Sequence, residues 1–431
     1  MTGLTIFDTI GILCFLIVCF LGLLILFEPG LSYRIKPRFI SIESAEFLRL
    51  LGALCDAQVR TLDSVEVLHN GDQFYKAELE AIARASQSIH LEAFIFKPGR
   101  IGHEFVQAMT ERARQGVRVK LVVDFIGSLT TPDSFFQPLR DAGGFVEWYQ
   151  PLRLTTFKRW NNRTHRKLIV IDGQLAFAGG ADIGDNWLYT LGRKPPWRDT
   201  VFCFQGDLVS GLQSTFAENW LESSGNILAD GDYFPLTRRE GGMPEKNISG
   251  FVVNSTPSAA RGTRAHILYQ TLLAYAAQSI HITTPYFVPD RSTLAEIVKA
   301  SAERRVKVVV LTPGKHANHL VTRVSSRRRY GELLKAGAEI WEYQPSMIHA
   351  KTMVIDGLWS IVGSTNFDNR SFGLNDEVNV AVRDPHMAER LEEDFQRDLQ
   401  QSKRITYEDW AKRPLREKVL EPLFCLFDRQ F

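Results

Sequence analysis

Two short segments of this sequence carry the same chemically active residues at the same spacing. In each segment a histidine is followed by a lysine two positions later, an aspartate seven positions later and a glycine fourteen positions later. The residues are His165, Lys167, Asp172 and Gly179 in the first segment, and His349, Lys351, Asp356 and Gly363 in the second. One such match would be roughly a one-in-a-thousand accident in a chain of this length. Two matches therefore indicate a duplicated functional segment.

The residues after each histidine are β-branched and apolar up to an Asp-Gly pair, which is typical of a strand that ends in a turn. This pattern predicts strands over residues 164–172 and 348–356. Side chains alternate across a strand, so each histidine and its lysine share one face, whereas Asp172 and Asp356 point to the other. We therefore interpret the His/Lys pairs as chemical. The two aspartates are interpreted as structural, closing a turn or pairing inside their own half of the chain.

Two histidines that face a phosphodiester can divide the work of group transfer between them. One neutral imidazole would attack phosphorus to give a phosphohistidine, and the other would protonate the leaving alkoxide and then deprotonate the incoming alcohol. Lys167 and Lys351, together with Ser364 and Asn366, offer donors to the phosphoryl oxygens. Neither motif is accompanied by a carboxylate cluster with metal-ligand spacing, so we expect no metal and no cofactor.

Length and composition describe an ordinary folded protein with more than one globular unit. The chain has 431 residues, of which 45% are hydrophobic and 23% are charged, and this length favours two units or one fused pair. A net charge of +2 is too small to indicate a nucleic-acid partner by itself. The five cysteines include no Cys-x-x-Cys pair, which argues against a disulfide framework or a zinc site.

The N-terminal region predicts a membrane anchor. Residues 10–27 are uninterrupted apolar residues or glycine, and the segment 4–28 is long enough to cross a bilayer. Basic residues follow at Arg34, Lys36 and Arg38, which by the positive-inside rule puts the catalytic part in the cytoplasm. Residues 29–65 are predicted to be a linker with an amphipathic helix. That helix could lie on a membrane surface, but docking on the first domain is the favoured interpretation.

The rest of the chain alternates helix and strand and then repeats itself, as two α/β units would. Residues 87–91 (Gln-Ser-Ile-His-Leu) return at 278–282 as Gln-Ser-Ile-His-Ile, and Leu-Arg-Asp-Ala-Gly at 139–143 returns as Leu-Lys-Ala-Gly at 334–337. We predict a first repeat over 66–228, a linker over 229–250, a second repeat over 251–402 and an amphipathic tail over 403–431. The tail could lie at a membrane interface or pack on the body. A basic, aromatic insert at 152–163 precedes the first histidine and is expected to overhang the site.

These motifs resemble the phospholipase D superfamily, and residues 363–372 with 375–379 resemble its bacterial cardiolipin synthase branch in particular. The resemblance implies two α/β sandwiches related by a pseudo-twofold axis, with one active site at their interface. By this resemblance, the catalytic residues are the motif residues His165, Lys167, Asp172, His349, Lys351 and Asp356. Supporting positions would be Asp199, Glu377, Gly180, Asp182, Ser364 and Asn366. Asp199 and Glu377, 34 and 28 residues after His165 and His349, would each hold the second nitrogen of the imidazole of their own half.

The sequence departs from the family pattern at two points. Gly180 and Asp182 stand where the family usually has Ser and Asn, so one half of the phosphate cradle is altered. There is also one apparent membrane span, where relatives often carry two.

The resemblance implies a single-pass phosphatidyltransferase of the bacterial inner membrane that converts two phosphatidylglycerol molecules into cardiolipin and glycerol. His165 would be the nucleophile and His349 the acid/base, although the duplicated motif leaves the two roles interchangeable. Three alternatives stay open: a hydrolase that releases phosphatidic acid, a nuclease on the same fold, and a catalytically inactive lipid-binding scaffold. The apolar N-terminal segment argues against the nuclease, and the intact His/Lys pairs argue against the scaffold. The acceptor alcohol, the membrane face of the site and the oligomeric state are left open.

Overall fold

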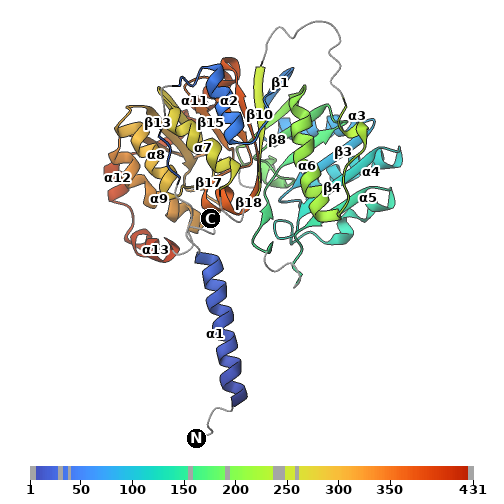
Figure 1. The fold of residues 1–431 in the computed structure, drawn as a ribbon, viewed down its shortest axis with the longest axis horizontal. Helices are drawn as coiled ribbons and strands as arrows, with labels where there is room; N and C mark the ends of the chain where they lie inside the picture. Colours follow the sequence, from blue (N-terminus) through green and yellow to red (C-terminus); the bar gives the residue numbers. More distant parts are fainter. Residues whose placement is uncertain are drawn as a thin grey trace.

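The structure is a computed structural model that describes residues 6–27, 33–36, 40–153, 159–189, 195–235, 248–257 and 262–425. It consists of a body with two sheets and a separate N-terminal helix, α1 (Ile6–Phe27), that projects away from the body (Figure 1). The two sheets lie side by side in the body, and each is accompanied by helices. We call the unit around the first motif the first half and the unit around the second motif the second half.

The sheet of the first half has seven strands in the order β2-β9-β8-β7-β3-β4-β5. Neighbours are antiparallel except for β3-β4 and β4-β5, which are parallel. The strands are β2 (Ser64–His69), β3 (Ser88–Ala93), β4 (Arg118–Asp124), β5 (Phe145–Tyr149), β7 (Leu168–Ile171), β8 (Leu175–Gly179) and β9 (Thr200–Gln205).

The sheet of the second half contains the same seven-strand order, β10-β18-β16-β15-β11-β13-β14, with additional strands at its margins. Its strands are β10 (Ile248–Ser255), β11 (Ser279–Thr283), β13 (Lys307–Pro313), β14 (Glu339–Tyr343), β15 (Thr352–Ile355), β16 (Trp359–Gly363) and β18 (Asn375–Arg383). The additional strands are β1 (Arg60–Leu62), β19 (Ser402–Ile405) and β6 (Arg163–Thr164), and β12 (Phe287–Val288) with β17 (Phe367–Asp368) forms a separate two-stranded ladder. The predicted tandem α/β repeat is therefore confirmed.

The helices of the body are α2 (Ala45–Leu54), α3 (Asn70–Arg84), α4 (Arg100–Arg114), α5 (Gln137–Asp141), α6 (Leu208–Ser224), α7 (Arg264–Tyr275), α8 (Arg291–Ala302), α9 (Leu320–Lys335), α10 (Asn369–Gly373), α11 (Pro385–Gln400), α12 (Tyr407–Ala411) and α13 (Leu415–Cys425). Short 3₁₀ turns occur at η1 (Asp133–Phe136), η3 (Asp185–Trp187) and η4 (Gly231–Tyr233). Each half has its own apolar core. A third core is shared, because Val170 and Phe202 of the first sheet pack in one cluster with Val362 and Val380 of the second.

The strand pattern shifts several of the predicted boundaries by a few residues. The first sheet begins at Ser64, the second begins at Ile248 inside the predicted linker, and β19 continues to Ile405. Strand β1 lies within the predicted linker at 29–65 and pairs with β10, so it belongs to the sheet of the second half. Most of the predicted linker, residues 236–247, lies outside the described residues.

The expectation that the helix near residue 50 docks on the first domain is wrong. Helix α2 packs on α7 of the second half, where Phe47 and Leu51 join the apolar core (Figure 1). The Phe47 ring lies 5.9 Å from the ring of Trp359, whose indole N–H donates to the Ile42 carbonyl at 3.0 Å. The helix is amphipathic as predicted, but its apolar spacing carries no information about which half it covers.

The C-terminal tail packs on the body. Trp410 of α12 lies over Gly331 of α9 and donates from its indole N–H to the Arg327 carbonyl at 2.6 Å. Glu417 of α13 pairs with the Arg327 guanidinium at 3.1 Å. The outer face of α13 leaves Leu415 and Val419 exposed, so packing on the body and an exposed apolar face occur together in this tail.

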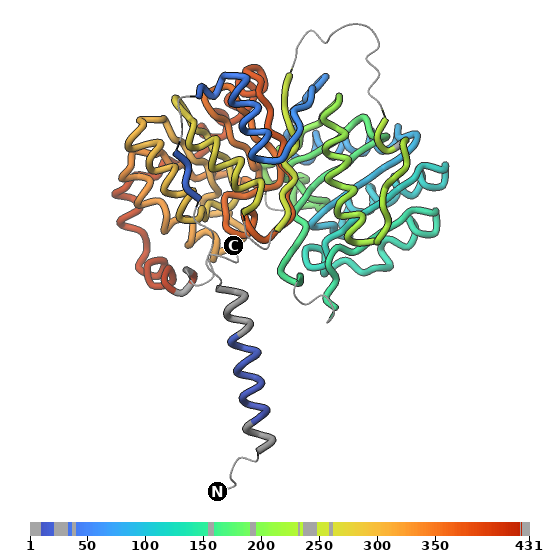
Figure 2. Tube along the Cα trace, viewed as in Figure 1, coloured from blue at the N-terminus to red at the C-terminus, as the bar shows by residue number. Residues whose placement is uncertain are grey.

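The course of α1 can be followed in Figure 2, where it leads away from the body. Among the described residues, no helix combines the length and the apolar character that a membrane crossing needs.

Replacing Phe47 with alanine tests the docking of α2. Phe47 is fully buried, so Phe47→Ala should lower the free energy of unfolding by about 3–5 kcal/mol. Leu54→Ala, at an exposed position of the same helix, should change it by no more than about 0.5 kcal/mol. Urea unfolding of the protein in detergent, followed by tryptophan fluorescence, measures both. Equal effects of the two substitutions would contradict the packing described here.

Candidate active site

The two histidines lie where the halves meet, and the backbone of each is held by the opposite half. The His165 amide donates to the Asp376 carbonyl at 2.9 Å, and the His349 amide donates to the Arg198 carbonyl at 2.7 Å. Residues 165–167 and 349–351 precede β7 and β15 and are not part of those strands, so the predicted strands over 164–172 and 348–356 begin too early. These segments leave their own sheets because they bond across the interface.

Each imidazole is also oriented by a carboxylate from the opposite half. His165 Nδ1 lies 3.0 Å from Glu377 Oε1, and His349 Nδ1 lies 2.9 Å from Asp199 Oδ2. The sequence associated Asp199 with the first histidine and Glu377 with the second, so the structure exchanges the partners. Since Nδ1 of each ring is held by a carboxylate, Nε2 is the nitrogen that can react with a substrate, although His349 Nε2 also has Lys351 Nζ 3.2 Å away.

Burial and neighbouring charges lower the pKa of both histidines. The histidines and lysines are each 7% exposed or less. Burial lowers the pKa of His165, and Lys167 and Lys351 lower it further against the opposing effect of Glu377. Burial and Lys351 lower the pKa of His349 to about 4, with Asp199 opposing. Both imidazoles are therefore neutral at neutral pH in the empty site, as a nucleophile must be.

The partner carboxylates stay ionised despite complete burial. Burial alone would raise the pKa of Asp199, but the hydrogen bond and charge of His349 hold it below its usual value. The pKa of Glu377 is lowered in the same way by His165, against the same effect of burial. Each carboxylate can therefore stabilise positive charge that develops on the ring it contacts.

The two lysines differ in their surroundings. Lys167 Nζ lies 3.3 Å from Asp182 Oδ2 and donates to the His165 carbonyl at 2.8 Å. Lys351 Nζ lies against the His349 ring, 2.9 Å from Nδ1 and 3.2 Å from Nε2. Burial lowers the pKa of Lys351 to about 7, with Asp199 opposing and Lys167 adding to the effect.

Gly180 and Ser364 occupy equivalent positions beside the two carboxylates. The Ser364 hydroxyl donates to Glu377 and accepts from the Val378 amide at 3.0 Å. At Gly180 a Cβ would collide with the Asp199 carboxylate and lie 2.9 Å from the His349 carbonyl oxygen. The indole N–H of Trp187 donates to Asp199 at 2.9 Å instead, so the departure from the family pattern at this position has a steric reason.

Asp172 and Asp356 are not brought to the histidines. The carboxylate of Asp172 accepts from the amides of residues 86–88, and that of Asp356 accepts from the amides of residues 277–279. Both residues have positive φ, 52° and 53°, in the Asp-Gly turns that follow β7 and β15. Their contacts support the structural interpretation within each half and contradict the assignment of these two residues to the catalytic set.

Arg327 and the insert residues Arg159 and Arg163 form ion pairs within the protein. Arg327 pairs with Glu342 at 2.8 Å, Arg159 pairs with Glu222 at 2.9 Å, and the buried Arg163 lies 3.6 Å from Asp124. Of the insert, residues 154–158, with Phe157 and Lys158, lie outside the described residues. Asn161 of the insert accepts from Arg370 of the second half at 3.0 Å, so the insert spans the interface.

Several residues that complete the site were given no role from the sequence, although Trp197 and Arg198 belong to a Trp-Arg-Asp run that resembles the family. Trp197 and Trp187 place their rings 5.4 and 5.7 Å from the His349 ring, and Phe94 lies 5.3 Å from the His165 ring. Arg198 forms a bidentate pair with Asp398 of α11 in the second half, at 3.2 and 3.0 Å. The Trp-Arg-Asp run at 197–199 was the available signal, but the sequence alone gives it no partner across the interface.

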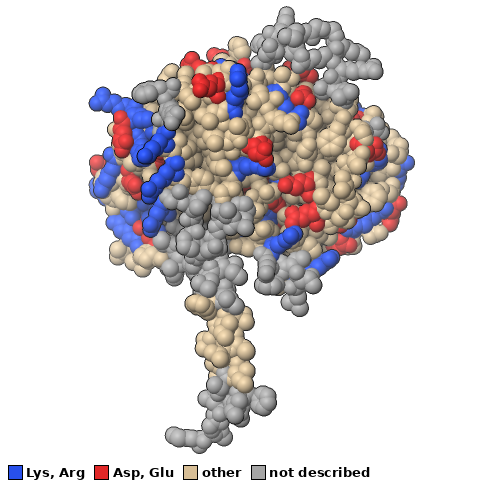
Figure 3. Space-filling view, viewed as in Figure 1, with Lys and Arg blue, Asp and Glu red and all other residues tan. Residues whose placement is uncertain are grey.

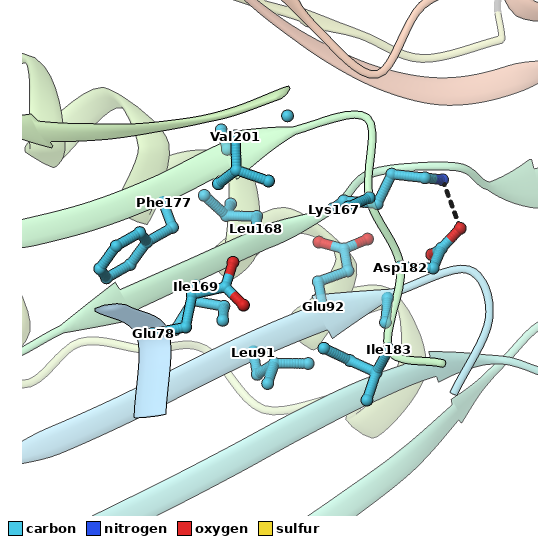
Figure 4. A pocket seen from close by; sticks show the side chains of 14 residues that line it. Glu78, Leu91, Glu92, Lys167, Leu168, Ile169, Phe177, Asp182, Ile183 and Val201 are labelled. Atoms are coloured by element: carbon cyan, nitrogen blue, oxygen red, sulfur yellow. Dashed lines mark ion pairs between the residues drawn. The ribbon is translucent and has the colours of Figure 1, made fainter. Parts of the chain in front are cut away.

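A small cavity lies beside the first motif (Figure 4). It is lined by Lys167 with its partner Asp182, by the buried carboxyl groups of Glu78 and Glu92, and by apolar side chains of the first sheet. Burial raises the pKa of Glu78 well above its usual value, which favours the neutral acid.

The fold and the paired His-x-Lys segments define a phospholipase D-like α/β enzyme with one composite site. Comparison with known proteins agrees with this description. The sequence matches the family model described as "Cardiolipin synthase, PLD-like domain" over residues 79–192 and 269–399. Each matched segment contains one of the two histidine motifs. The chain belongs to this cardiolipin synthase family, and it is an enzyme of the phosphatidyltransferase class.

Individual relatives are similar over most of the chain. The "Major cardiolipin synthase ClsA" of Bacillus subtilis is 35% identical over 83% of this chain and 73% of its own length. "Cardiolipin synthase 1" of Staphylococcus epidermidis is 33% identical over 89% of this chain and 77% of its own length. Among solved structures, the phosphatidylserine synthase of Haemophilus influenzae has a similar fold, with a TM-score of 0.70 at 15% identity over 90% of this chain and 100% of that one.

The exchange of carboxylates predicts which histidine responds to which substitution. Glu377→Gln should alter the ring nitrogen signals of His165, and Asp199→Asn those of His349, because each carboxylate contacts the other half's ring. Both variants should lose about 10²–10⁴-fold in kcat. Nitrogen NMR of histidine-labelled protein and initial-rate assays measure the two effects. A response in the histidine of the same half would contradict the observed pairing.

The lowered pKa of Lys351 predicts an alkaline limit. Lys351 loses its charge as the pH rises through about 7, so binding of an anionic substrate should weaken above that pH. We expect kcat/KM to fall about tenfold per pH unit there, while kcat holds to higher pH because a bound phosphate keeps the lysine charged. Lys351→Arg retains the charge and should remove this fall. An unchanged pH profile in that variant would assign the limit to another group.

Proposed function

We propose that the protein transfers a phosphatidyl group between two phosphatidylglycerol molecules, giving cardiolipin and glycerol. The observation that carries the proposal is the reciprocal pairing at one interface: each imidazole is held by a buried carboxylate of the other half, in a chain of the cardiolipin synthase family. Two oriented imidazoles and two buried ammonium groups suit a phosphodiester substrate. The cardiolipin synthase names of the relatives support phosphatidylglycerol as that substrate.

The reaction proceeds in two steps through one histidine. Binding of the anionic phosphodiester favours protonation of the second histidine, which takes up a proton from solvent before the first step. In that step, Nε2 of the nucleophile bonds to phosphorus as the bond from phosphorus to the glycerol headgroup oxygen breaks, and the protonated second histidine gives that oxygen its proton. In the second step, a headgroup hydroxyl of another phosphatidylglycerol loses its proton to the second histidine and displaces the imidazole. Cardiolipin is released, and both rings return to their starting protonation states.

We assign the nucleophile to His165 and the acid/base to His349. An imidazole that attacks phosphorus acquires positive charge, and Lys351 lies against the His349 ring, where it would oppose that charge. Lys167 directs its ammonium group to a backbone carbonyl and to Asp182 instead. The neighbouring lysine makes protonated His349 a stronger acid, which suits proton donation to the leaving group.

The side chains around the motif support charge stabilisation without further groups. Lys351 can donate to the phosphoryl oxygens that carry the charge of the transition state. Asn366 is buried, and among the described residues its side-chain oxygen has no hydrogen-bond partner, so its amide can turn toward a bound phosphate. Ser364 supports Glu377 and is not assigned to the phosphate.

Burial of the site favours a lipid alcohol over water as the acceptor. Water is abundant, so a transferase must exclude it and hold the alcohol near phosphorus. The near-complete burial of both histidines and the insert that spans the halves support this exclusion. A hydrolase would use the same histidines but would need open access to water. Hydrolysis is therefore the second candidate function.

We also propose that the apolar N-terminal segment, residues 4–28, anchors the enzyme in the bacterial inner membrane with the body in the cytoplasm. The large apolar side chains of α1 between Ile10 and Phe20 are exposed, and no charged side chain is drawn between its grey ends in Figure 3. An exposed apolar helix favours a lipid environment. Leu415 and Val419 of α13, at the same end of the body as α1 in Figure 1, would add a second contact with the bilayer surface.

Product analysis tests the proposed function. Purified protein given only radiolabelled phosphatidylglycerol in mixed micelles should form mainly cardiolipin with little phosphatidic acid, and added glycerol should drive the reaction backwards. His165→Ala and His349→Ala should each reduce turnover by several orders of magnitude, because both rings act in one step. Thin-layer chromatography separates the lipids, and circular dichroism shows whether each variant is folded. Phosphatidic acid as the main wild-type product would favour the hydrolase.

A further inference from the structure

The two halves place different charges around their lysines although their strands correspond one to one. Glu92 pairs in the ladder with Leu168, the residue after Lys167, and Thr283 pairs with Thr352, the residue after Lys351. Glu78 and Tyr269 are also equivalent, because each lies seven residues before the C-cap of its helix, α3 and α7 respectively. Asp182 and Asn366 are a third pair of equivalent residues. The positions around Lys167 therefore hold the carboxyl groups of Glu78, Glu92 and Asp182, and the equivalent positions around Lys351 hold none.

Of the three carboxyl groups, Asp182 is the one in contact with the lysine. Its Oδ2 lies 3.3 Å from Lys167 Nζ, and both side chains are buried. Burial raises the pKa of Glu78 and so favours its neutral form, and Glu92 accepts from Thr164 and from Asn219 at 2.6 Å with the charge of Arg166 nearby. Figure 4 shows Lys167 directed at Asp182. Of the three groups, Asp182 is therefore the carboxylate that pairs directly with Lys167.

We infer that Asp182 is a specificity residue that reduces the positive charge of the phosphate cradle, so that the site takes a monoanionic phosphodiester in preference to a dianionic phosphate monoester. This inference rests on the proposed function, in which the substrate phosphate is a diester. Lys167 and Asp182 together contribute no net charge, whereas the equivalent pair of the second half, Lys351 and Asn366, contributes one positive charge. Removing the charge of Asp182 would make the site more positive by one unit, which favours a dianion more than a monoanion.

A preference for a phosphodiester over a phosphate monoester is useful in this reaction. A phosphatidyl donor carries one negative charge on its phosphodiester, whereas phosphatidic acid, the product of adventitious hydrolysis, has a monoester group that carries up to two. A cradle with one more positive charge would bind that monoester more tightly than this cradle does. The ion pair in the first half prevents this, while Lys167 still lies at the site through its bond to the His165 carbonyl.

A purely structural role of Asp182 makes a different prediction. Asp182 Oδ1 accepts from the backbone amides of Phe94 and Ile95 at 3.0 and 2.9 Å, so the residue also holds the loop after β3. An asparagine can accept the same two bonds through its carbonyl oxygen and occupies nearly the same volume. Asp182→Asn therefore removes the charge while keeping the shape and the loop contacts.

The test measures the binding of two tetrahedral anions to the full-length protein in detergent by isothermal titration calorimetry. The probes are dimethyl phosphate, a monoanionic diester, and sulfate, a dianion at all working pH values. The wild-type protein should bind dimethyl phosphate at least as well as sulfate. Asp182→Asn should shift the ratio of the two dissociation constants toward sulfate by about tenfold or more. An equal change for both anions, or no change, would overturn the inference.

Asn366→Asp provides the matched control, because it adds a charge at the equivalent position of the second half. It should weaken sulfate more than dimethyl phosphate, again by about tenfold. The two variants should shift the ratio of the two dissociation constants in opposite directions. Either variant alone is therefore a sufficient test if the other does not fold. The binding measurement needs no turnover. A protein that makes no cardiolipin but shows the charge-dependent shift would refute the proposed function alone, and a synthase without the shift would refute this inference alone.

Discussion

The site depends on one physical arrangement, a buried carboxylate of each half that holds the imidazole of the other. A buried carboxylate is costly unless it is paired and hydrogen-bonded. Asp199 and Glu377 are both fully buried, and each finds its compensation in a histidine across the interface. Each carboxylate also accepts a hydrogen bond from its own half, Asp199 from Trp187 and Glu377 from Ser364, so both halves contribute to the stabilisation of these buried groups. The composite site and the association of the two halves are stabilised by the same contacts.

The surrounding structure fixes the distance across that interface. The shared apolar core joins the two sheets, β6 pairs with β18, and Arg198 forms a bidentate pair with Asp398. The backbone amides of both histidines bond across the same boundary. Small displacements of reacting groups reduce catalysis strongly, so a site assembled from two halves needs this number of independent contacts to keep its imidazoles in register.

The sequence was sufficient for the fold, but not for the pairing of residues within the candidate site. The repeated apolar pattern and the turn signals predicted two corresponding α/β halves, because local periodicity reports strand and helix type. The structure brings the predicted histidines and carboxylates together at one interface. Which carboxylate contacts which ring depends on the arrangement of residues 150 and 212 positions apart. For the same reason, the apolar face of α2 was recognised but its partner was not.

The duplicated scaffold also shows how two halves with one backbone pattern can differ in chemistry. Gly180 and Ser364 stand at one position, and their difference follows from how closely the neighbouring carboxylate approaches the backbone. Asp182 and Asn366 stand at another, and there the difference is one of charge beside a phosphate-binding lysine. A phosphodiester is itself asymmetric, with a leaving group on one side and a retained lipid on the other. A site with exact twofold symmetry would bind it equally in two orientations, and divergence at these positions removes that equivalence.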